Sequence, residues 1–376
     1  MQQSRMKRKQ NRTPQSLGYR MPAEWEPHEG TWLGWPHNQT DWPGKFQPIP
    51  WVYADIVYHL AQVERVRILV NSQAAEDHAR EVLQRANALR ETVEFLRWPT
   101  NRGWTRDSGP IFVRNDGPRA RGSARRKKKD GAAPVAVVNF RFNAWAKYND
   151  WKLDNAIPGR AARHLKVPEF SPRIGEDGAH MVLEGGSIDV NGFGSMLTTE
   201  ECLLSDVQQR NPGATREDLE RAFAEYLGVT NTIWLGSGIV GDDTHGHVDD
   251  VARFVAPDVV VCASEPDPAD ANYEPLADNL RRLREAATET GRQLRVVELP
   301  MPRPIIHRGR RLPASYANFY IANRLVLVPT FNDRNDRVAL NTLAELFPDR
   351  DVVGIHCGDL VWGLGTLHCM TQQQPG

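Results

Sequence analysis

The chain has 376 residues, of which 40% are hydrophobic and 25% are charged. These proportions are typical of soluble globular proteins, and they exclude disorder over the whole chain. Lys plus Arg and Asp plus Glu balance at 47 each. The composition therefore gives no electrostatic case for nucleic acid or an anionic membrane as the main partner.

The N-terminal segment is basic and polar, but no apolar signal core follows it. No stretch approaches the roughly eighteen consecutive apolar residues of a membrane span. The cysteines are too few for a disulfide framework in a chain of this length, and none forms a C-x-x-C pair. They are Cys202, Cys262, Cys357 and Cys369. We therefore expect a cytoplasmic protein with free thiols and no membrane partner.

Two segments are predicted to lie outside the folded body. Residues 1–20 form a basic stretch without apolar periodicity, which indicates a mobile tail. Residues 118–133 contain five consecutive Arg and Lys residues between two apolar runs, which favours an exposed basic loop joining two strands. This loop lacks interleaved aromatic residues that could stack on bases, so a solvated loop is the simpler interpretation than a nucleic-acid patch.

Between these segments, short β-type runs alternate with helical patterns. The predicted strands lie at 66–70, 135–140, 232–235, 259–262, 294–299, 325–328 and 352–355. One helix is predicted from a Thr215 cap to a Gly228 stop, with Leu219, Phe223 and Tyr226 on one face. A second is marked by Leu276, Leu280, Leu283 and Ala287, and a third by Leu340, Leu343 and Phe347 before Pro348. The alternation predicts an α/β fold without a dinucleotide-binding fingerprint.

Cys369 is the candidate nucleophile. Gly363 and Gly365 before it permit a close backbone approach, and the polar run Thr371-Gln372-Gln373 follows it. An isolated cysteine is otherwise most often a buried apolar residue. Cys357 follows a β-type run and lacks the polar neighbours, so we expect it to be structural.

Two separate aspartates are candidates for binding a cation. Asp107 lies in a Trp-x-Arg-Asp-x-Gly-Pro turn that starts at Trp104, and Asp249 lies in the run 246–250. A planar guanidinium group is bound best by carboxylates placed along its edge. A thiol, an imidazole and two carboxylates together suit attack on a guanidinium carbon and hydrolysis of the adduct. An ordinary turn aspartate remains the alternative for Asp107.

His247 is the candidate acid and base. If its segment is an extended strand, His247 and Asp249 point to the same face, while Val251, Phe254 and Val255 pack into the core. Several further titratable residues lie nearby: Asp242, Asp243, His245 and Asp250. A metal site is the rival interpretation, but the run lacks a helical His pair or a cysteine framework, so we expect no metal. A zinc site of His356, Cys357, His368 and Cys369 is a weaker alternative.

At these residues the chain resembles the agmatine deiminases and the related bacterial-type peptidylarginine deiminases. The resemblance extends from about residue 21 to residue 373, and its motifs occur in the family's order. They are the runs at 21–28, 34–36, 104–110, 184–187, 246–249, 315–320 and 368–373.

The resemblance implies a pentein fold, which is a pseudo-fivefold α/β propeller of ββαβ-type units around a central active site. Residues 21–376 would then form a single catalytic domain. By position, Cys369 matches the family's nucleophile, His247 its general acid and base, and Asp107 and Asp249 its guanidinium-binding carboxylates. Trp104 and Glu184 fall in matching motifs and are expected to line the site, with no metal or organic cofactor. One departure lies in residues 363–367, where the family is richer in glycine and has an asparagine.

The implied reaction converts agmatine to N-carbamoylputrescine and ammonia through a cysteine thiouronium intermediate, within polyamine biosynthesis toward putrescine. Agmatine carries a second positive charge, and Asp242 or Asp243 is the candidate carboxylate for it. Two alternatives stay open: a peptidylarginine deiminase with the same chemistry, and a non-catalytic pentein that binds a macromolecular partner. Homo-oligomer formation is also left open by the sequence.

Overall fold

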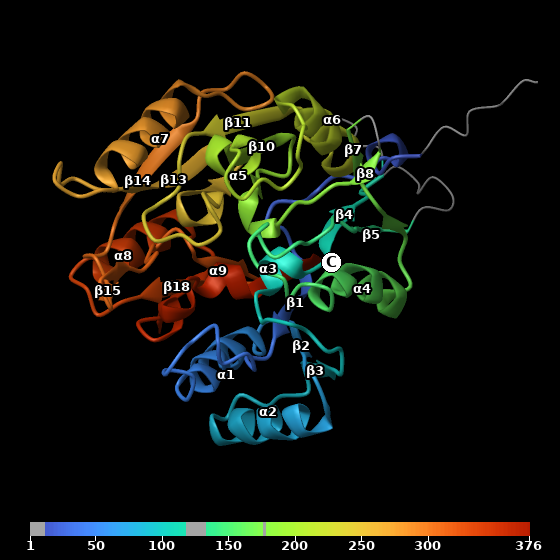
Figure 1. The fold of residues 1–376 in the computed structure, drawn as a ribbon, viewed down its shortest axis with the longest axis vertical. Coiled ribbons are helices and arrows are strands. Elements are labelled where there is room, and N and C mark those ends of the chain that lie inside the picture. Colours follow the sequence, from blue (N-terminus) through green and yellow to red (C-terminus); the bar gives the residue numbers. More distant parts are fainter. Residues whose placement is uncertain (1–11, 118–132, 176–177) are drawn as a thin grey trace, which may run out of the picture.

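The computed structural model describes residues 12–117, 133–175 and 178–376. Within these ranges, five sheets of three or four strands surround a common centre, and most longer helices lie toward the outside (Figure 1). In this described part, no helix is both long and apolar enough to cross a membrane.

Each sheet repeats one pattern of pairing, in which an antiparallel pair is followed by a parallel pair across a helical connection. In one sheet, β12 (Ala252–Ala256) pairs antiparallel with β13 (Val259–Ser264). Helix α7 (Tyr273–Glu285) then leads to β14 (Arg295–Pro300), which lies parallel to β13. Three further sheets share this order: β4 (Ile111–Arg114), β5 (Val135–Val138), α4 (Ile157–Leu165), β6 (Glu169–Phe170); β9 (Asp189–Val190), β10 (Ser195–Thr199), α5 (Glu200–Leu204), α6 (Arg216–Leu227), β11 (Asn231–Leu235); and β17 (Tyr320–Ala322), β18 (Leu325–Thr330), α8 (Asp336–Leu346), β19 (Asp351–His356).

The fifth sheet joins the two ends of the fold. Its elements are β1 (His28–Gly34), α1 (Ile49–Leu60), β2 (Arg65–Leu69), α2 (Gln73–Arg85) and β3 (Val93–Leu96). The last strand, β20 (Thr371–Pro375), pairs antiparallel with β1 and places Gln372 opposite Trp32. The C-terminal strand therefore completes the N-terminal sheet and closes a ring of five ββαβ-type units, which confirms the predicted pentein architecture.

The remaining elements are short. Two hairpins consist of β7 (Arg173–Ile174) with β8 (Ala179–His180) and β15 (Ile306–His307) with β16 (Arg310–Arg311). The short helical turns are η1 (Gln15–Leu17), α3 (Thr105–Ser108), η2 (Asp154–Ala156), η3 (Gly185–Ser187), η4 (Val248–Asp250), η5 (Leu360–Gly363) and α9 (Leu367–Met370).

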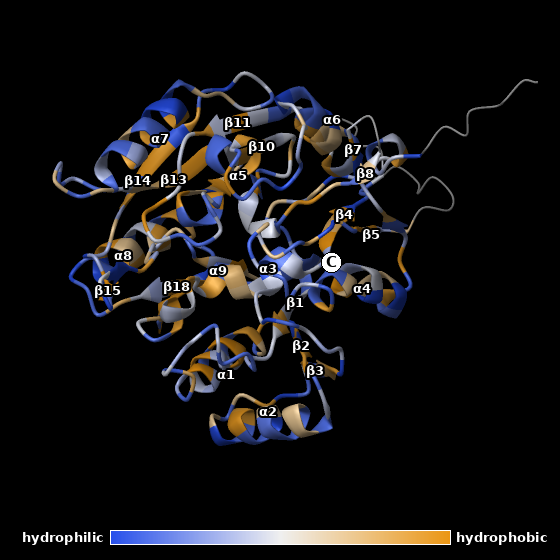
Figure 2. Cartoon of the chain, in the orientation of Figure 1, coloured by the Kyte–Doolittle hydropathy of each residue, from blue (hydrophilic) through white to orange (hydrophobic). Residues whose placement is uncertain are grey.

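Local sequence explains the ends and faces of the helices. In α6, the Thr215 side chain accepts a bond from the Asp218 amide while the Asp218 side chain accepts from the Thr215 amide, and Gly228 ends the helix at φ +73°. The predicted start and stop of this helix are therefore confirmed. Helix α7 ends at Glu285, before the predicted Ala287. Figure 2 shows hydrophobic strands and helices with polar outer surfaces.

The predicted tail and loop fall partly outside the description. Residues 1–11 and 118–132 are not among the described residues. Of the rest of the predicted tail, Tyr19 is 3% exposed and Arg20 forms ion pairs with Glu26 and Asp116. The packed body therefore begins before residue 21.

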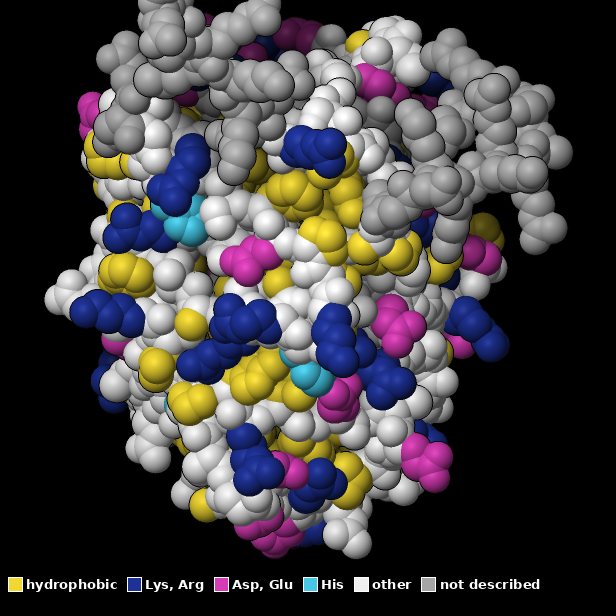
Figure 3. Space-filling view, turned by 90° about the vertical axis from the view of Figure 1, so that its right-hand side faces the viewer, with side chains coloured by type: hydrophobic (Ala, Val, Ile, Leu, Met, Phe, Trp, Pro, Cys, Tyr) yellow, Lys and Arg dark blue, Asp and Glu magenta, His cyan; other side chains and the backbone are white. Residues whose placement is uncertain are grey.

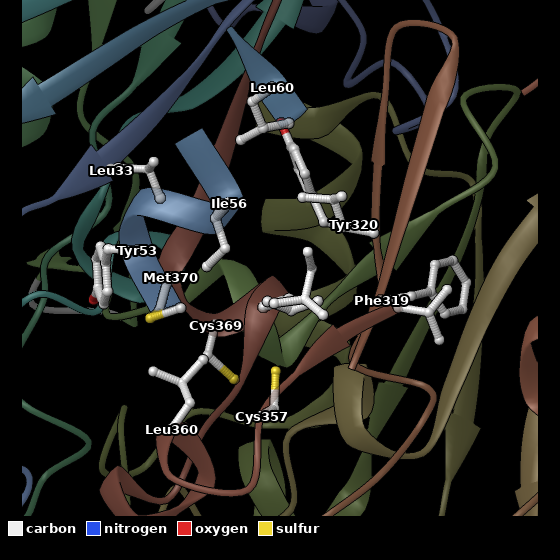
Figure 4. Packing of buried hydrophobic residues seen from close by; sticks show 14 of the residues in the cluster. Leu33, Tyr53, Ile56, Leu60, Phe319, Tyr320, Cys357, Leu360, Cys369 and Met370 are labelled. Carbon is white, nitrogen blue, oxygen red and sulfur yellow. The ribbon is translucent and has the colours of Figure 1, made fainter. Parts of the chain in front are cut away.

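The largest buried cluster lies beside the centre of the ring. It includes residues of α1, such as Tyr53 and Ile56, together with Leu360, Cys357 and Cys369 (Figure 4). On the outer face seen in Figure 3, basic, acidic and apolar side chains are interspersed. The apolar packing is thus internal, where it fixes the turns that carry the site.

Those turns share one topological position. In four units, a short helical turn comes directly or almost directly before the first strand: α3 before β4, η3 before β9, η4 before β12 and α9 before β20. Turn α3 packs against both α9 and η3, and η3 packs against η4. The fivefold arrangement therefore gathers residues that are far apart in sequence at one central place.

Candidate active site

Cys369 lies on α9 at the inner end of a pocket of about 500 Å³. The side chain is almost buried, and its Sγ lies 3.1 Å from Asn318 Nδ2 and 3.8 Å from Asp249 Oδ2. The pocket is lined by Thr40, Asp41, Arg102, Trp104, Asp107, Trp145, Tyr148, Asp243, Thr244, Gly363, Leu364, Gly365 and Cys369.

Asp107 lies on α3 and faces the same pocket. Its Oδ1 accepts the Gly186 amide at 3.0 Å, and its Oδ2 accepts Trp145 Nε1 at 2.8 Å. Burial, together with the nearby charge of Asp249, raises the pKa of Asp107 to about 6 despite its histidine neighbour. The carboxylate is therefore held in place but is costly to ionise until a cation arrives.

His247 lies between two carboxylates. Its Nδ1 is 3.7 Å from Asp107 Oδ1, and its Nε2 is 3.8 Å from Glu184 Oε2. The ring is buried, and neither nitrogen has a hydrogen-bond partner among the described residues. Although burial opposes the charged form, Asp107 and other neighbours raise the pKa of His247 well above its usual value. The site thus favours an imidazolium in the free protein.

Asp249 lies on the turn η4 and not on a strand. The predicted extended strand begins only at Ala252, because residues 248–250 form a 3₁₀ turn. Val251, Phe254 and Val255 are buried as predicted. The turn still brings Asp249 and His247 to the same centre, so the predicted strand was wrong while the grouping was right.

His368 holds Asp249 from behind. The His368 ring contacts Asp249 Oδ2 at 2.7 Å through Nδ1 and Glu24 Oε2 at 2.9 Å through Nε2. Against the effect of burial, the bond to His368 keeps the pKa of Asp249 below its ordinary value. The two guanidinium-binding candidates are therefore unequal, since Asp249 is the more readily ionised.

Glu184 lies directly before η3 and behind His247. It is fully buried, and Arg210 Nε donates to its Oε1 at 3.0 Å. The charge of Arg210, which outweighs the effect of burial, lowers the pKa of Glu184 to about 2. Glu184 does not line the pocket itself, so its position supports His247 more directly than it supports a ligand.

The surroundings of Cys369 keep its thiol protonated. Burial is the main cause, and the charges of Asp249, Asp250 and Asp107 add to it, so that the pKa of Cys369 is raised well above the ordinary range. Burial and Asp249 also raise the pKa of Asp250, which accepts a bond from Asn318 Nδ2 at 3.0 Å. A cation bound among these groups would lower the pKa of Cys369 and so favour the thiolate.

Gly186 is packed against three of the site residues. A Cβ at this position would lie 2.6 Å from His247 Nδ1, 2.8 Å from Asp107 Oδ1 and 3.1 Å from Asp249 Oδ2. Real Cβ atoms do not approach so closely. The absent side chain therefore allows the imidazole and both carboxylates to converge.

The segment before the nucleophile is strained where it departs from the family pattern. Leu364 adopts φ +71° and ψ 26°, a left-handed conformation that glycine adopts freely and leucine does not. It lines the pocket between Gly363 and Gly365, and both of these glycines lie close to the Trp104 side chain. Trp104 lines the pocket as expected. The departure from the family pattern at residues 363–365 changes the part of the pocket wall next to Trp104.

The two candidates for a distant amine lie in different places. Asp243 lines the pocket, and it is bonded to the partly exposed side chains of Lys147 and Arg310, which marks it as the outer part. Asp242 instead accepts the amides of Thr244, Gly246 and His247, so its carboxylate shapes the turn before the histidine.

Several residues of the site had only weak signals in the sequence. Asn318 and Gly186 lie in family motifs that indicate no separate role for them, and the sequence gives no signal for Trp145 or Arg210. Asn318, Trp145 and Arg210 act through contacts across 51, 38 and 26 residues of sequence, and Gly186 acts through a missing side chain. No local pattern reveals such contacts. His368 is adjacent to the predicted nucleophile, but the sequence suggests for it only the weaker alternative of a zinc ligand.

Two buried groups of side chains have the spacing of metal ligands. One consists of Glu184, Cys202 and His247, and the other of Asp249, Asp250 and Cys369; within each, the ligand atoms lie within 4.8 Å of one another. Apart from Cys202, these are residues of the candidate site or its immediate neighbours. A bound metal ion would compete with a guanidinium for them.

Comparison with known proteins agrees with this geometry. The model of the Porphyromonas-type peptidyl-arginine deiminase family matches residues 20–375. A Legionella pneumophila protein provisionally named agmatine deiminase is 35% identical over 368 residues, covering 97% of this chain and 97% of that protein. The solved structure of the Enterococcus faecalis agmatine deiminase has 33% identity and a TM-score of 0.84, covering 96% of this chain and 97% of that one.

A second solved structure, a C. jejuni agmatine deiminase with substrate bound, has 28% identity and a TM-score of 0.80 and covers 95% of this chain and 96% of that one. The resemblance drawn from the sequence motifs is confirmed over nearly the whole chain. The chain belongs to the Porphyromonas-type peptidyl-arginine deiminase family and is a deiminase, an enzyme that hydrolyses amidine C–N bonds.

Proposed function

We propose that this deiminase hydrolyses agmatine to N-carbamoylputrescine and ammonia, with Cys369 as the nucleophile. The observation that carries the proposal is a buried group of a thiol, two carboxylates and an imidazole, of which Cys369 and Asp107 line a pocket that also holds the further carboxylate of Asp243. The Sγ of Cys369 lies 3.8 Å from Asp249 Oδ2, and Asp107 lines the same space. Such a pocket suits a slender molecule with a cation at each end.

In the proposed complex, the guanidinium lies between Asp107 and Asp249 with its carbon facing Cys369. The added positive charge removes the electrostatic penalty that the carboxylates impose on the thiolate. Cys369 then loses its proton only when substrate is present, because the pKa of the free thiol is raised well above the ordinary range. This dependence would protect the thiol from other electrophiles.

The reaction then has two stages. The thiolate of Cys369 forms a bond to the guanidinium carbon, and His247 as imidazolium gives a proton to the departing nitrogen, which leaves as ammonia. A covalent thiouronium remains. Neutral His247 takes one proton from water as the water oxygen attacks the same carbon. The C–S bond then breaks, and the remaining hydroxyl proton of the adduct passes to the leaving sulfur, which releases the neutral ureido product and restores the Cys369 thiol. The proton that Cys369 lost when substrate bound has left to solvent, so the overall reaction converts guanidinium and water to the ureido product, ammonia and one proton.

Two buried side chains, Glu184 and His368, support the reacting residues during this cycle. Glu184 stays ionised next to Arg210 and favours the imidazolium form of His247 that the first stage requires. His368 holds Asp249 in one orientation. Neither group has to touch the reacting carbon for these effects.

The proposal is tested by measuring ammonia release from agmatine, free arginine and a blocked arginyl peptide, with wild type and Cys369→Ser side by side. Cys369-dependent release from agmatine alone would support it. Turnover of the peptide would assign the chain to peptidylarginine chemistry instead. No release from any of the three would favour a non-catalytic binding protein and would contradict the proposal.

A further inference from the structure

Asp243, the carboxylate at the outer part of the pocket, is already occupied in the free protein. Its Oδ1 lies 2.8 Å from Lys147 Nζ and 2.9 Å from Arg310 Nη2. Its Oδ2 accepts the Tyr148 hydroxyl at 2.6 Å. An incoming ammonium would therefore meet two resident cations on one carboxylate oxygen.

The position of Arg310 is set by a close backbone approach. Arg310 belongs to the β15–β16 hairpin, and Gly241 lies just before Asp243 at φ +96°. A Cβ at Gly241 would lie 2.4 Å from the Arg311 carbonyl oxygen. The hairpin therefore rests directly against the turn that carries Asp243.

The two resident cations are not held equally. Lys147 follows three consecutive residues in the left-handed region, Ala144, Trp145 and Ala146 at φ +51°, +57° and +53°, and its amide donates to the Ala144 carbonyl. Its side chain is 37% exposed. The Arg310 side chain is 52% exposed and comes from a hairpin with only two residue pairs. Arg310 is thus the cation that an incoming charge displaces more easily.

We propose that Arg310 competes with the terminal ammonium of the substrate for Asp243 and so sets the affinity for guanidines that carry a second positive charge. This inference rests on the proposed function. A guanidine without a terminal amine does not need Asp243, and it binds without displacing Arg310. Arg310 is therefore a specificity-determining residue that weakens the binding of dicationic substrates.

The expected effect is modest and confined to binding. An exposed ion pair contributes little free energy, so its removal should change affinity by about two- to fivefold. Asp243 lies at the outer part of the pocket, away from the reacting carbon, so ground state and transition state should gain equally. KM should change while kcat does not.

The experiment compares Arg310→Gln with Arg308→Gln on two substrates, agmatine and n-butylguanidine. Arg308 is an exposed arginine of the same hairpin turn without an ion pair to Asp243, so its variant removes the same charge at nearly the same place. Arg310→Gln should lower KM for agmatine about two- to fivefold and leave KM for n-butylguanidine unchanged. Arg308→Gln should change neither. In an Asp243→Asn background, Arg310→Gln should have no further effect, because the two residues act through one contact.

Three results would overturn the inference. The first is an unchanged or higher KM for agmatine in Arg310→Gln, and the second is an equal change for both substrates. The third is a change of KM for agmatine in Arg308→Gln equal to that in Arg310→Gln, which would indicate that any positive charge on the hairpin has the same effect. Failure of the proposed function has a different signature: wild type would then release no Cys369-dependent ammonia from agmatine, and the inference would fall with it.

Discussion

We call the end of the pocket lined by Cys369 and Asp107, together with Asp249 and His247 packed behind it, the floor. Both carboxylates are buried there beside a histidine whose nitrogens have no hydrogen-bond partner in the described part of the chain. At the outer end, the mouth, Asp243 is bonded to Lys147 and Arg310. The floor thus holds charges that lack full compensation, whereas the mouth holds charges that are compensated and partly in water.

This difference shows where the binding free energy of a cation is expected to come from. Burial raises the pKa of Asp107 even though both of its oxygens accept hydrogen bonds, so a guanidinium at the floor removes an existing penalty on this carboxylate. At the mouth, an ammonium must replace cations that are already there. We therefore expect floor variants to act on the chemical steps and mouth variants to act mainly on KM.

The largest effect should follow from removing a reacting group at the floor. Cys369→Ser and His247→Ala should each lower kcat by at least about 10³-fold, because one loses the nucleophile and the other loses the proton carrier. Cys357→Ser serves as the control, since Cys357 is buried in the same apolar cluster (Figure 4) but is not among the residues that line the pocket. It should remain active. Circular dichroism would check the fold, and near-normal turnover by Cys369→Ser would contradict the assignment.

A smaller but still large effect is expected from Gly186→Ala. The added methyl group would have to displace His247 and Asp107, and a misplacement of about 1 Å can cost about 10²-fold in rate. Gly159→Ala is the matched control, because a Cβ there meets its nearest atoms at ordinary distances of 3.4 Å or more in helix α4. If kcat/KM of Gly186→Ala stays within twofold of wild type, the convergence of the three groups on this glycine has no catalytic importance.

The pH dependence of the floor should reflect Asp107. Its pKa is raised to about 6, so the carboxyl is protonated below that pH in the free enzyme. Because kcat/KM reports the free enzyme, it should fall about tenfold per pH unit below about pH 6. A profile of ammonia release from pH 4.5 to 8 would show this limb, and a flat profile down to pH 5 would contradict it.

The raised pKa of Asp107 also makes the free energy of unfolding depend on pH: activity should rise with pH, whereas stability should fall. A carboxyl whose pKa is raised on folding stabilises the folded state below its unfolded pKa, and this contribution is lost as pH rises through about 6. Asp107→Asn removes this titration. The free energy of unfolding of the variant, relative to that of wild type, should therefore increase as the pH is raised from 4 to 7, while turnover is lost. Urea unfolding of both proteins at these two pH values measures the difference.

The sequence predicted the parts of this comparison that depend on local pattern. The helix with its Thr215 cap, the pairing runs of the sheets and the family motifs around Cys369 are all readable over a few residues. The strand expected around His247 was wrong because the alternation of His247, Asp249 and Val251 also fits a turn that enters a strand at Ala252. Periodicity over three residues does not separate the two.

The contacts that distinguish floor from mouth could not be predicted in this way. Arg310 reaches Asp243 across 67 residues, and Trp145 reaches Asp107 across 38 residues. Both depend on how connections between strands fold back toward the centre of the ring, which a single sequence does not encode as a spacing. Asp242 and Asp243 show this limit of prediction from sequence. They are adjacent in the chain, but Asp242 bonds the backbone of a turn whereas Asp243 lines the pocket.

The smallest effect, and the one that sharpens the comparison most, concerns this pair. Asp243→Asn should raise KM for agmatine about fivefold with kcat nearly unchanged, because it removes one partly exposed charge contact at the mouth. Asp242→Asn should act differently, since its carboxylate bonds the amides of Gly246 and His247 and so positions the imidazole. It should lower kcat and leave the preference for agmatine over arginine unchanged. Steady-state kinetics on both substrates measures the two patterns, and an unchanged preference in both variants would show that neither aspartate binds the substrate amine.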